Sequence, residues 1–125
     1  MTSTEAERGG STVNKIECFV QPFDFEAIAG SMVAAGVVGM SVTEVRGFGV
    51  QRGFKRGQTA TPGAYVFHPK TKIEVVVKDS DVDRVIEACK TAIKSNQIGE
   101  GKIFVTPVDG AVRARTGEQG EAAIV

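Results

Sequence analysis

The sequence predicts an α+β domain made of two consecutive βαβ units with an antiparallel sheet. A strand-like alternation followed by helical apolar spacing occurs twice along the chain, and one long glycine-rich segment separates the two occurrences. Hydrophobic residues make up 42% of the 125 residues, which is enough for one packed core. Two βαβ units in so short a chain are typical of the split βαβ, ferredoxin-like fold.

The first unit follows residues 1–14, which we expect to form a flexible polar tail. Lys15–Val20 alternates apolar and polar side chains, so it is predicted to be a strand. Asp24 is a candidate helix N-cap, and apolar residues at helical spacing follow until Gly36, where the helix should stop. Ser41–Phe48 is β-branched and alternating, which predicts a second strand.

The second unit repeats this order of elements. Lys72–Val77 is strongly β-branched and predicts a strand, and Ser80 is a candidate N-cap for the helix that follows. Apolar side chains then recur at helical spacing over Val82–Ile93. Two glycines interrupt the pattern before Ile103–Val105, which begins the last predicted strand.

Between the units lies Gly49–Pro69, which contains four glycines, two prolines and no clear periodicity. From Gly47 through His68 the chain has no acidic residue, whereas positions 52, 55 and 56 are basic. A loop this long in a compact domain is either a solvated insertion or a functional segment. As a functional segment it would be an arm that contacts an acidic partner surface.

Composition narrows the function classes. The net charge is zero, which disfavours nucleic acid and anionic membranes as partners. Cys18 and Cys89 lie within apolar patterns and are expected to be reduced core residues, and His68 is expected on a loop surface rather than in a metal site. No catalytic constellation, signal peptide or membrane-spanning segment is evident, so we expect a cytoplasmic protein that is not an enzyme.

Three groups could bind a ligand. Gly99–Lys102 is a glycine-bracketed turn with a lysine that could meet phosphate, although a helix-to-strand turn alone would explain the glycines. Arg113 and Arg115, two apart in a segment expected to be extended, could form a phosphate clamp or a solvated basic edge. Gly47–Gly49 with Gln51 would be a hinge at the root of the long loop.

Three stretches of the chain resemble the PII nitrogen-regulatory proteins: GMSVTEVRGFG (Gly39–Gly49), KTKIEVVV (Lys70–Val77) and IGEGKIFVTPVDGAVRARTGEQGE (Ile98–Glu121). The likeness covers about residues 15–123, and the long loop matches the family's T-loop in length. It implies a homotrimer with ATP or ADP in clefts between subunits. The T-loop would span about 49–69, the B-loop about 95–102 and a C-terminal segment about 109–125 of the domain 15–125.

The resemblance also implies roles for individual residues. Magnesium, held with ATP by Gln51, and the effector 2-oxoglutarate, near Gln51, Arg52, Gly53, Lys70 and Gly99, would bind at the root of the T-loop. The nucleotide-binding residues would be Ser41, Gly47, Phe48, Gly49, Glu74, Gly99, Glu100, Gly101, Lys102, Arg113 and Arg115, with both arginines reaching into the neighbour's cleft.

The chain departs from typical members in its loop. Val50 replaces an arginine that often lies near the phosphates, and Gly63 occupies the position of the tyrosine that many bacterial members modify, with Tyr65 two residues later. Gln21 replaces the usual basic residue before Pro22. We therefore expect the loop to have a partner of its own.

The resemblance implies a non-catalytic sensor of adenylate and 2-oxoglutarate that regulates a nitrogen-related enzyme or a membrane transporter, to which it could be recruited from the cytoplasm. One alternative is a divergent PII-like adenylate sensor that serves carbon, bicarbonate or other transport. The others are a slow ATPase and a purely structural trimer with an idle cleft.

Overall fold

The computed structural model describes residues 12–48, 66–93 and 101–125. Two βαβ units are present within these ranges, as predicted. Their elements are β1 (Val13–Val20), α1 (Phe25–Ala34), β2 (Ser41–Gly47), β3 (His68–Lys78), α2 (Val82–Ala92) and β4 (Lys102–Pro107), with the 3-10 turns η1 (Pro22–Asp24), η2 (Asp79–Asp81) and η3 (Gly120–Ile124).

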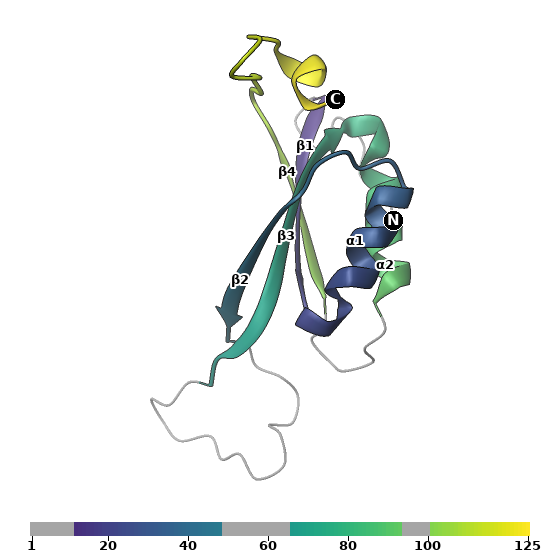
Figure 1. Ribbon diagram of the computed structural model, residues 1–125, viewed down its shortest axis with the longest axis vertical. Coiled ribbons are helices and arrows are strands. Elements are labelled where there is room, and N and C mark those ends of the chain that lie inside the picture. Colours follow the sequence, from purple (N-terminus) through teal and green to yellow (C-terminus); the bar gives the residue numbers. More distant parts are fainter. Residues whose placement is uncertain (1–11, 49–65, 94–100) are drawn as a thin grey trace.

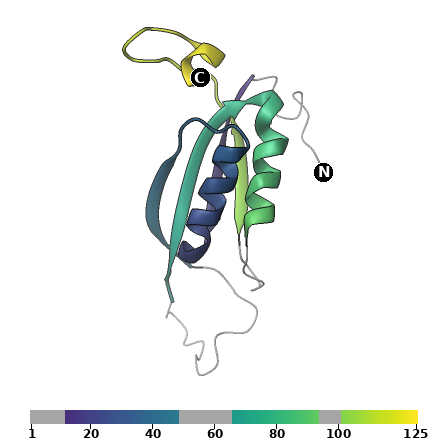
Figure 2. The same ribbon diagram turned by 45° about the vertical axis from the view of Figure 1, so that its right-hand side comes forward.

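The strands form one sheet in the order β2-β3-β1-β4, and every neighbouring pair is antiparallel. The two helices lie side by side against one face of the sheet (Figure 2). This arrangement confirms the ferredoxin-like double βαβ fold. Among the described residues no helix covers the other face, and we call it the open face (Figure 1).

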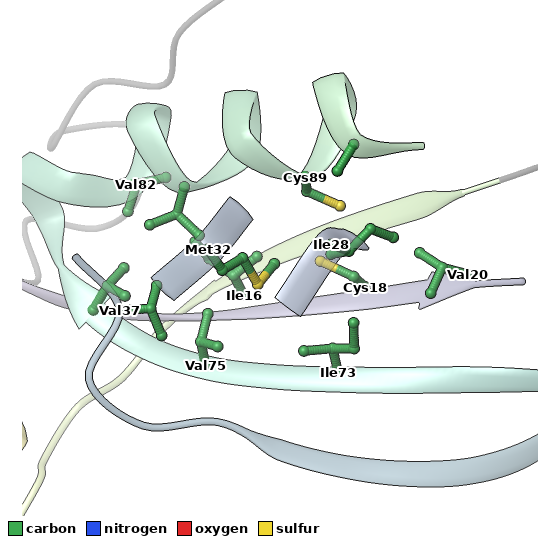
Figure 3. Close-up of a cluster of buried hydrophobic side chains, with 13 residues drawn as sticks. Ile16, Cys18, Val20, Ile28, Met32, Val37, Ile73, Val75, Val82 and Cys89 are labelled. Carbon is green, nitrogen blue, oxygen red and sulfur yellow. The ribbon is translucent and has the colours of Figure 1, made fainter. Parts of the chain in front are cut away.

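The core lies between the sheet and the helices (Figure 3). Strand alternation directs every second residue of β1 and β3 toward the helices, so that Ile16, Cys18 and Ile73 are fully buried against Ile28 and Met32 of α1 and Val82, Val85 and Cys89 of α2. This burial is what fixes the strand register, because a slip of one residue would turn the apolar side chains to the open face.

Both cysteines are buried free thiols, as predicted. The hydrogen bond between Cys18 and Cys89, together with burial, raises the pKa of the Cys18 thiol. Cys18 is therefore protonated at neutral pH and behaves as a small core residue.

Three boundaries differ from the prediction. β1 begins at Val13, so the last two residues of the expected tail belong to the sheet, and the buried Asn14 side chain donates to Asp79 Oδ1 at 3.1 Å. β3 begins at His68, which pairs with Gly47 instead of lying in the loop. Ser80 is not an N-cap, because η2 intervenes and places Asp81 at the start of α2.

Helix α1 starts and stops where the sequence predicted. Asp24 is its N-cap by position, and Gly36, with φ +102°, turns the chain away just beyond its end. Arg84 of α2 donates from Nε to the Ala35 carbonyl at 2.8 Å and pairs with Asp81 at 3.1 Å, which fastens the end of α1 to α2. Neither helix that the structure describes has the length and apolarity to cross a membrane.

Candidate functional site

A cavity of about 410 Å³ lies at the end of the sheet where β2 begins. Its apolar walls come from the α1–β2 connection, β3 and η3, and its polar groups from three strands. The residues that line it are Lys15, Val38, Gly39, Met40, Ser41, Glu74, Val76 and Ile124. Apolar walls with a few polar groups suit a small molecule that has a flat apolar part and a polar edge.

Strand register brings Ser41 and Glu74 together in this cavity. The two residues are direct partners across β2 and β3, so their side chains point to the same face of the sheet, the open face. Lys15 of β1 lies opposite Val76 and places its Nζ 3.5 Å from Glu74 Oε2. The cavity therefore holds a hydroxyl, a carboxylate and an ammonium group within one wall.

Glu74 and Lys15 also belong to a four-charge cluster on the open face, which we call the charge box (Lys15, Glu17, Lys72 and Glu74). Lys72 Nζ lies 3.1 Å from Glu17 and 3.9 Å from Glu74, and Lys15 Nζ lies 3.9 Å from Glu17. The hydrogen bond from Lys72 lowers the pKa of Glu17. The carboxylate beside the cavity is thus held in an alternating arrangement of charges.

The two arginines follow β4 in a hairpin and not in an extended segment. Val112 and Gln119 form an isolated antiparallel bridge, the Arg113 N–H donates to Glu118 O at 2.8 Å, and residues 114–116 make a turn. The prediction that both arginines project from one side of an extended chain is therefore wrong, because Arg115 lies in the turn and Arg113 precedes it.

The arginine side chains also differ in their contacts. Arg113 is half-buried, donates a hydrogen bond to the backbone oxygen of Val125 and lies 3.7 Å from Glu118 Oε1. Arg115 is exposed, and its side chain has no hydrogen-bond or ion-pair partner among the described residues. The exposed guanidinium is available to an anion as it stands.

A second group of predicted residues lies at the opposite end of the sheet. Gly47 ends β2 and packs closely on Lys70, whose Cγ would be 3.3 Å from a Cβ at that glycine. Phe48 stacks on Phe67 with ring centroids 5.8 Å apart, so the two aromatic rings mark the root of the long loop.

The start of β4 is at this same end. Gly101 has φ +74°, and a Cβ there would come within 2.8 Å of Ile93 Cδ1, so only glycine fits. Lys102 is exposed opposite Phe19, and its side chain makes no polar contact with the described part of the chain. Gly49, Gln51, Arg52, Gly53, Gly99 and Glu100 lie outside the described residues.

The predicted residues thus form two groups that one chain does not bring together. By strand register, Ser41 and Glu74 lie beside the cavity, Gly47 and Lys70 lie toward the other end of β2, and Lys102 begins β4 opposite Phe19 on the far side of β1. The six residue steps of β2 from Ser41 to Gly47 correspond to about 20 Å.

Sequence reasoning missed several cavity residues. Val38, Gly39 and Met40 directly precede Ser41, so they could have been predicted as its neighbours in the site. Lys15 and Ile124 reach the cavity only through strand register and the fold-back of η3, and no local pattern indicates either. In the described ranges no cluster of three His, Cys, Asp or Glu side chains could hold a metal ion, and Gln51, which the resemblance suggests as a magnesium ligand, lies outside them.

Comparisons with known proteins bear on this geometry. A family model described as nitrogen regulatory protein P-II matches residues 13–118. The nitrogen regulatory proteins P-II of Cereibacter sphaeroides and Azospirillum brasilense are each 45% identical over 112 residues, which is 90% of this chain and the whole of each relative.

Solved structures agree with the sequence relatives. Arabidopsis thaliana PII bound to citrate superposes with a TM-score of 0.72 at 35% identity, over 90% of this chain and 92% of that one. The Bacillus subtilis GlnK–ATP complex gives 0.74 at 30% identity, over 90% and 97%. The chain belongs to the P-II family of nitrogen regulatory signalling proteins.

Proposed function

We propose that this chain is the subunit of a homotrimer that binds ATP or ADP in clefts between neighbouring subunits and reports their occupancy through the loop at about 49–69. The separation of the two residue groups carries the proposal. Since Ser41 and Gly47 end the same strand about 20 Å apart, one subunit would supply the cavity end and its neighbour the Lys102 end.

The cavity suits the adenosine part of the ligand. The side chains of Val38 and Val76 would pack on the purine base, and Ser41 and Glu74 would bond to its polar edge or to the ribose. The solved GlnK complex with ATP, to which this chain is similar, supports a nucleotide as the ligand.

The phosphates need cations from both subunits. Lys102 and Arg115 are exposed and have no polar side-chain partner in the described ranges, so no internal ion pair has to break when they bind an anion. Arg113 would supply a third cation from within the hairpin. Gly101 permits the backbone next to Lys102 to approach the phosphates closely.

Magnesium and 2-oxoglutarate would bind at the root of the loop. Gln51 would hold the metal with ATP, and a carboxylate of 2-oxoglutarate would pair with Lys70, close to Arg52, Gly53 and Gly99. Lys70 supplies a cation to the described part of this site, and its aliphatic stem lies against Gly47 near the end of β2. The related Arabidopsis PII binds citrate, which is also a small polycarboxylate.

Signalling would follow from the position of this second ligand. A ligand at the loop root biases the loop only through contacts that differ between loop conformations. Its partner would be a nitrogen-related enzyme or transporter with an acidic surface, since the loop carries basic residues and no acidic ones. The protein would act in the cytoplasm as a regulator and not as an enzyme.

Calorimetric titration of the purified trimer with ATP tests the nucleotide site. Lys102→Ala should lower affinity by about 1.5–3 kcal/mol, because a charge-assisted contact is lost. Lys90→Ala, an exposed lysine of α2 outside the site, should bind ATP as the wild-type protein does. A monomer that binds ATP normally, or an unchanged affinity of Lys102→Ala, would contradict the intersubunit site.

Adding 2-oxoglutarate in the presence of Mg-ATP separates the nitrogen sensor from an adenylate sensor of another pathway. Val50 replaces an arginine that often lies near the phosphates, and this departure is the reason to test for an adenylate sensor of another pathway. Heat that appears only with both ligands supports the nitrogen sensor. If that heat is absent, the protein is an adenylate sensor of another pathway. If the protein hydrolyses ATP and the hydrolysis requires Lys102, it is an ATPase.

A further inference from the structure

The segment after the arginine hairpin folds back onto the sheet. The Gly120 N–H donates to the Ala111 carbonyl at 2.9 Å, and Gly120 takes φ +66°, a backbone conformation that side-chain-bearing residues rarely adopt. This turn directs η3 toward β3 (Figure 1), and Ile124 of η3 lines the cavity. The hairpin and η3 are therefore one connected unit.

Ile124 of η3 is a wall of the cavity. With Val38 and Val76 it borders both the 410 Å³ cavity and a neighbouring one of about 200 Å³, so its side chain lies where the two meet. An aliphatic side chain in this position packs against the flat face of a ligand that enters the larger cavity.

Val125, the residue after Ile124, is hydrogen-bonded to Arg113. The backbone oxygen of Val125 accepts a hydrogen bond from Arg113 Nη2, while the other terminal nitrogen of Arg113 faces Glu118. A guanidinium has five N–H donors, so these contacts leave others free for an anion. The wall of the cavity and the anchor of the arginine are thus adjacent residues of one chain.

We propose that η3 is a selectivity element of the nucleotide site. Ile124 packs on the base, and Val125 holds Arg113 in reach of the phosphates, so a ligand that has both a base and phosphates gains from the two contacts together. This inference rests on the proposed nucleotide binding and adds residues to it. Val125 acts on the phosphates only through Arg113 and is a positioning residue, and Ile124 affects Arg113 by fixing the place of the adjacent Val125.

The test is a double-mutant cycle on ATP affinity with the trimeric protein, read by calorimetry. Ile124→Ala should weaken ATP about tenfold, because aliphatic contact with the base is lost. In the Arg113→Ala background the same change should cost clearly less, so that the double variant loses less than the product of the two single losses. Val112→Ala, an exposed valine of the same hairpin that does not line the cavity, should bind as the wild type does.

Ile124→Val, which removes one carbon, should weaken ATP by about threefold and serves if the alanine variant does not assemble. Unchanged ATP affinity in Ile124→Ala, or in Ile124→Val where that variant stands in for it, overturns the inference while nucleotide binding stands. If the loss of ATP affinity in the double variant equals the product of the two single losses, the link between Ile124 and Arg113 is overturned. Failure of the wild-type trimer to bind ATP overturns the proposed function, and this inference with it.

Discussion

At the scale of single residues, the charge box shows how a strand pattern becomes an electrostatic arrangement. Glu17 and Glu74 are direct partners across β1 and β3, and the ammonium groups of Lys15 and Lys72 each lie within 3.9 Å of both carboxylates. Glu17 is paired most closely with Lys72, at 3.1 Å, and this contact lowers its pKa. The two lysines thus offset the repulsion between two carboxylates that lie directly opposite each other.

The lowered pKa makes stability depend on pH. Glu17 binds its proton less readily in the folded state than in the unfolded state, where its pKa is near 4.5, so its contribution is fully present above that value. It is lost as pH falls through the lower, folded pKa. Urea unfolding of the wild type at pH 7 and at pH 3 should show this decrease at a fixed protein concentration.

The matched control is Glu17→Gln, which keeps the size of the side chain and removes its charge. We expect this variant to be less stable than the wild type at pH 7 and to lose less stability between pH 7 and pH 3. Equal losses in both proteins would contradict the assignment of the effect to Glu17.

At the scale of elements, the end of α1 depends on one glycine and on α2. Gly36 takes φ +102°, and Arg84 bonds to the Ala35 carbonyl beside it, with Nη2 3.3 Å from where a Cβ of residue 36 would stand. By contrast, Gly30 lies inside α1 and has open space where a Cβ would be. Gly30 inside α1 and Gly36 beyond its end should therefore respond in opposite ways to substitution by alanine.

We expect Gly36→Ala to destabilise the protein by about 1–2 kcal/mol, the cost of a positive φ for a residue with a Cβ. Gly30→Ala should stabilise it by about 0.5–1 kcal/mol, since alanine has the higher helix propensity. Thermal or urea unfolding of both variants in parallel measures the difference. A stabilising Gly36→Ala would show that the chain ends the helix in another way.

At the scale of the whole molecule, the open face is the surface that a trimer would cover. Phe104 is half exposed there and packs edge-on against Phe19 with ring centroids 5.9 Å apart, and Val76 adds further exposed apolar surface. The opposite face of the sheet is already covered by α1 and α2 (Figure 2). Exposed aromatic and aliphatic side chains on a sheet are typical of an interface.

Phe104→Asp should therefore shift the trimer toward monomers, because it places a charge in an apolar contact. Sedimentation velocity would measure the species, and circular dichroism would check that the fold persists. Val33→Asp, on the exposed side of α1, should remain trimeric. A trimer that survives Phe104→Asp would place the interface elsewhere.

The sequence by itself determined the two βαβ units, the buried thiols and the family. These follow from local patterns, because alternation in Lys15–Val20 and helical spacing in Val82–Ile93 reflect which side chains must leave water. Motif residues such as Ser41 and Lys102 could also be named in advance, because each belongs to a contiguous stretch that resembles one family.

Only the tertiary structure decided how these residues are distributed in space. The pairing of Ser41 with Glu74, the turn that separates Arg113 from Arg115, and the approach of Ile124 to the cavity all depend on contacts between distant segments. Burial of the core sets strand register, and register then decides which motif residues share one end of the sheet. Local spacing does not contain that information, and so the division of the site into two groups emerged only from the fold.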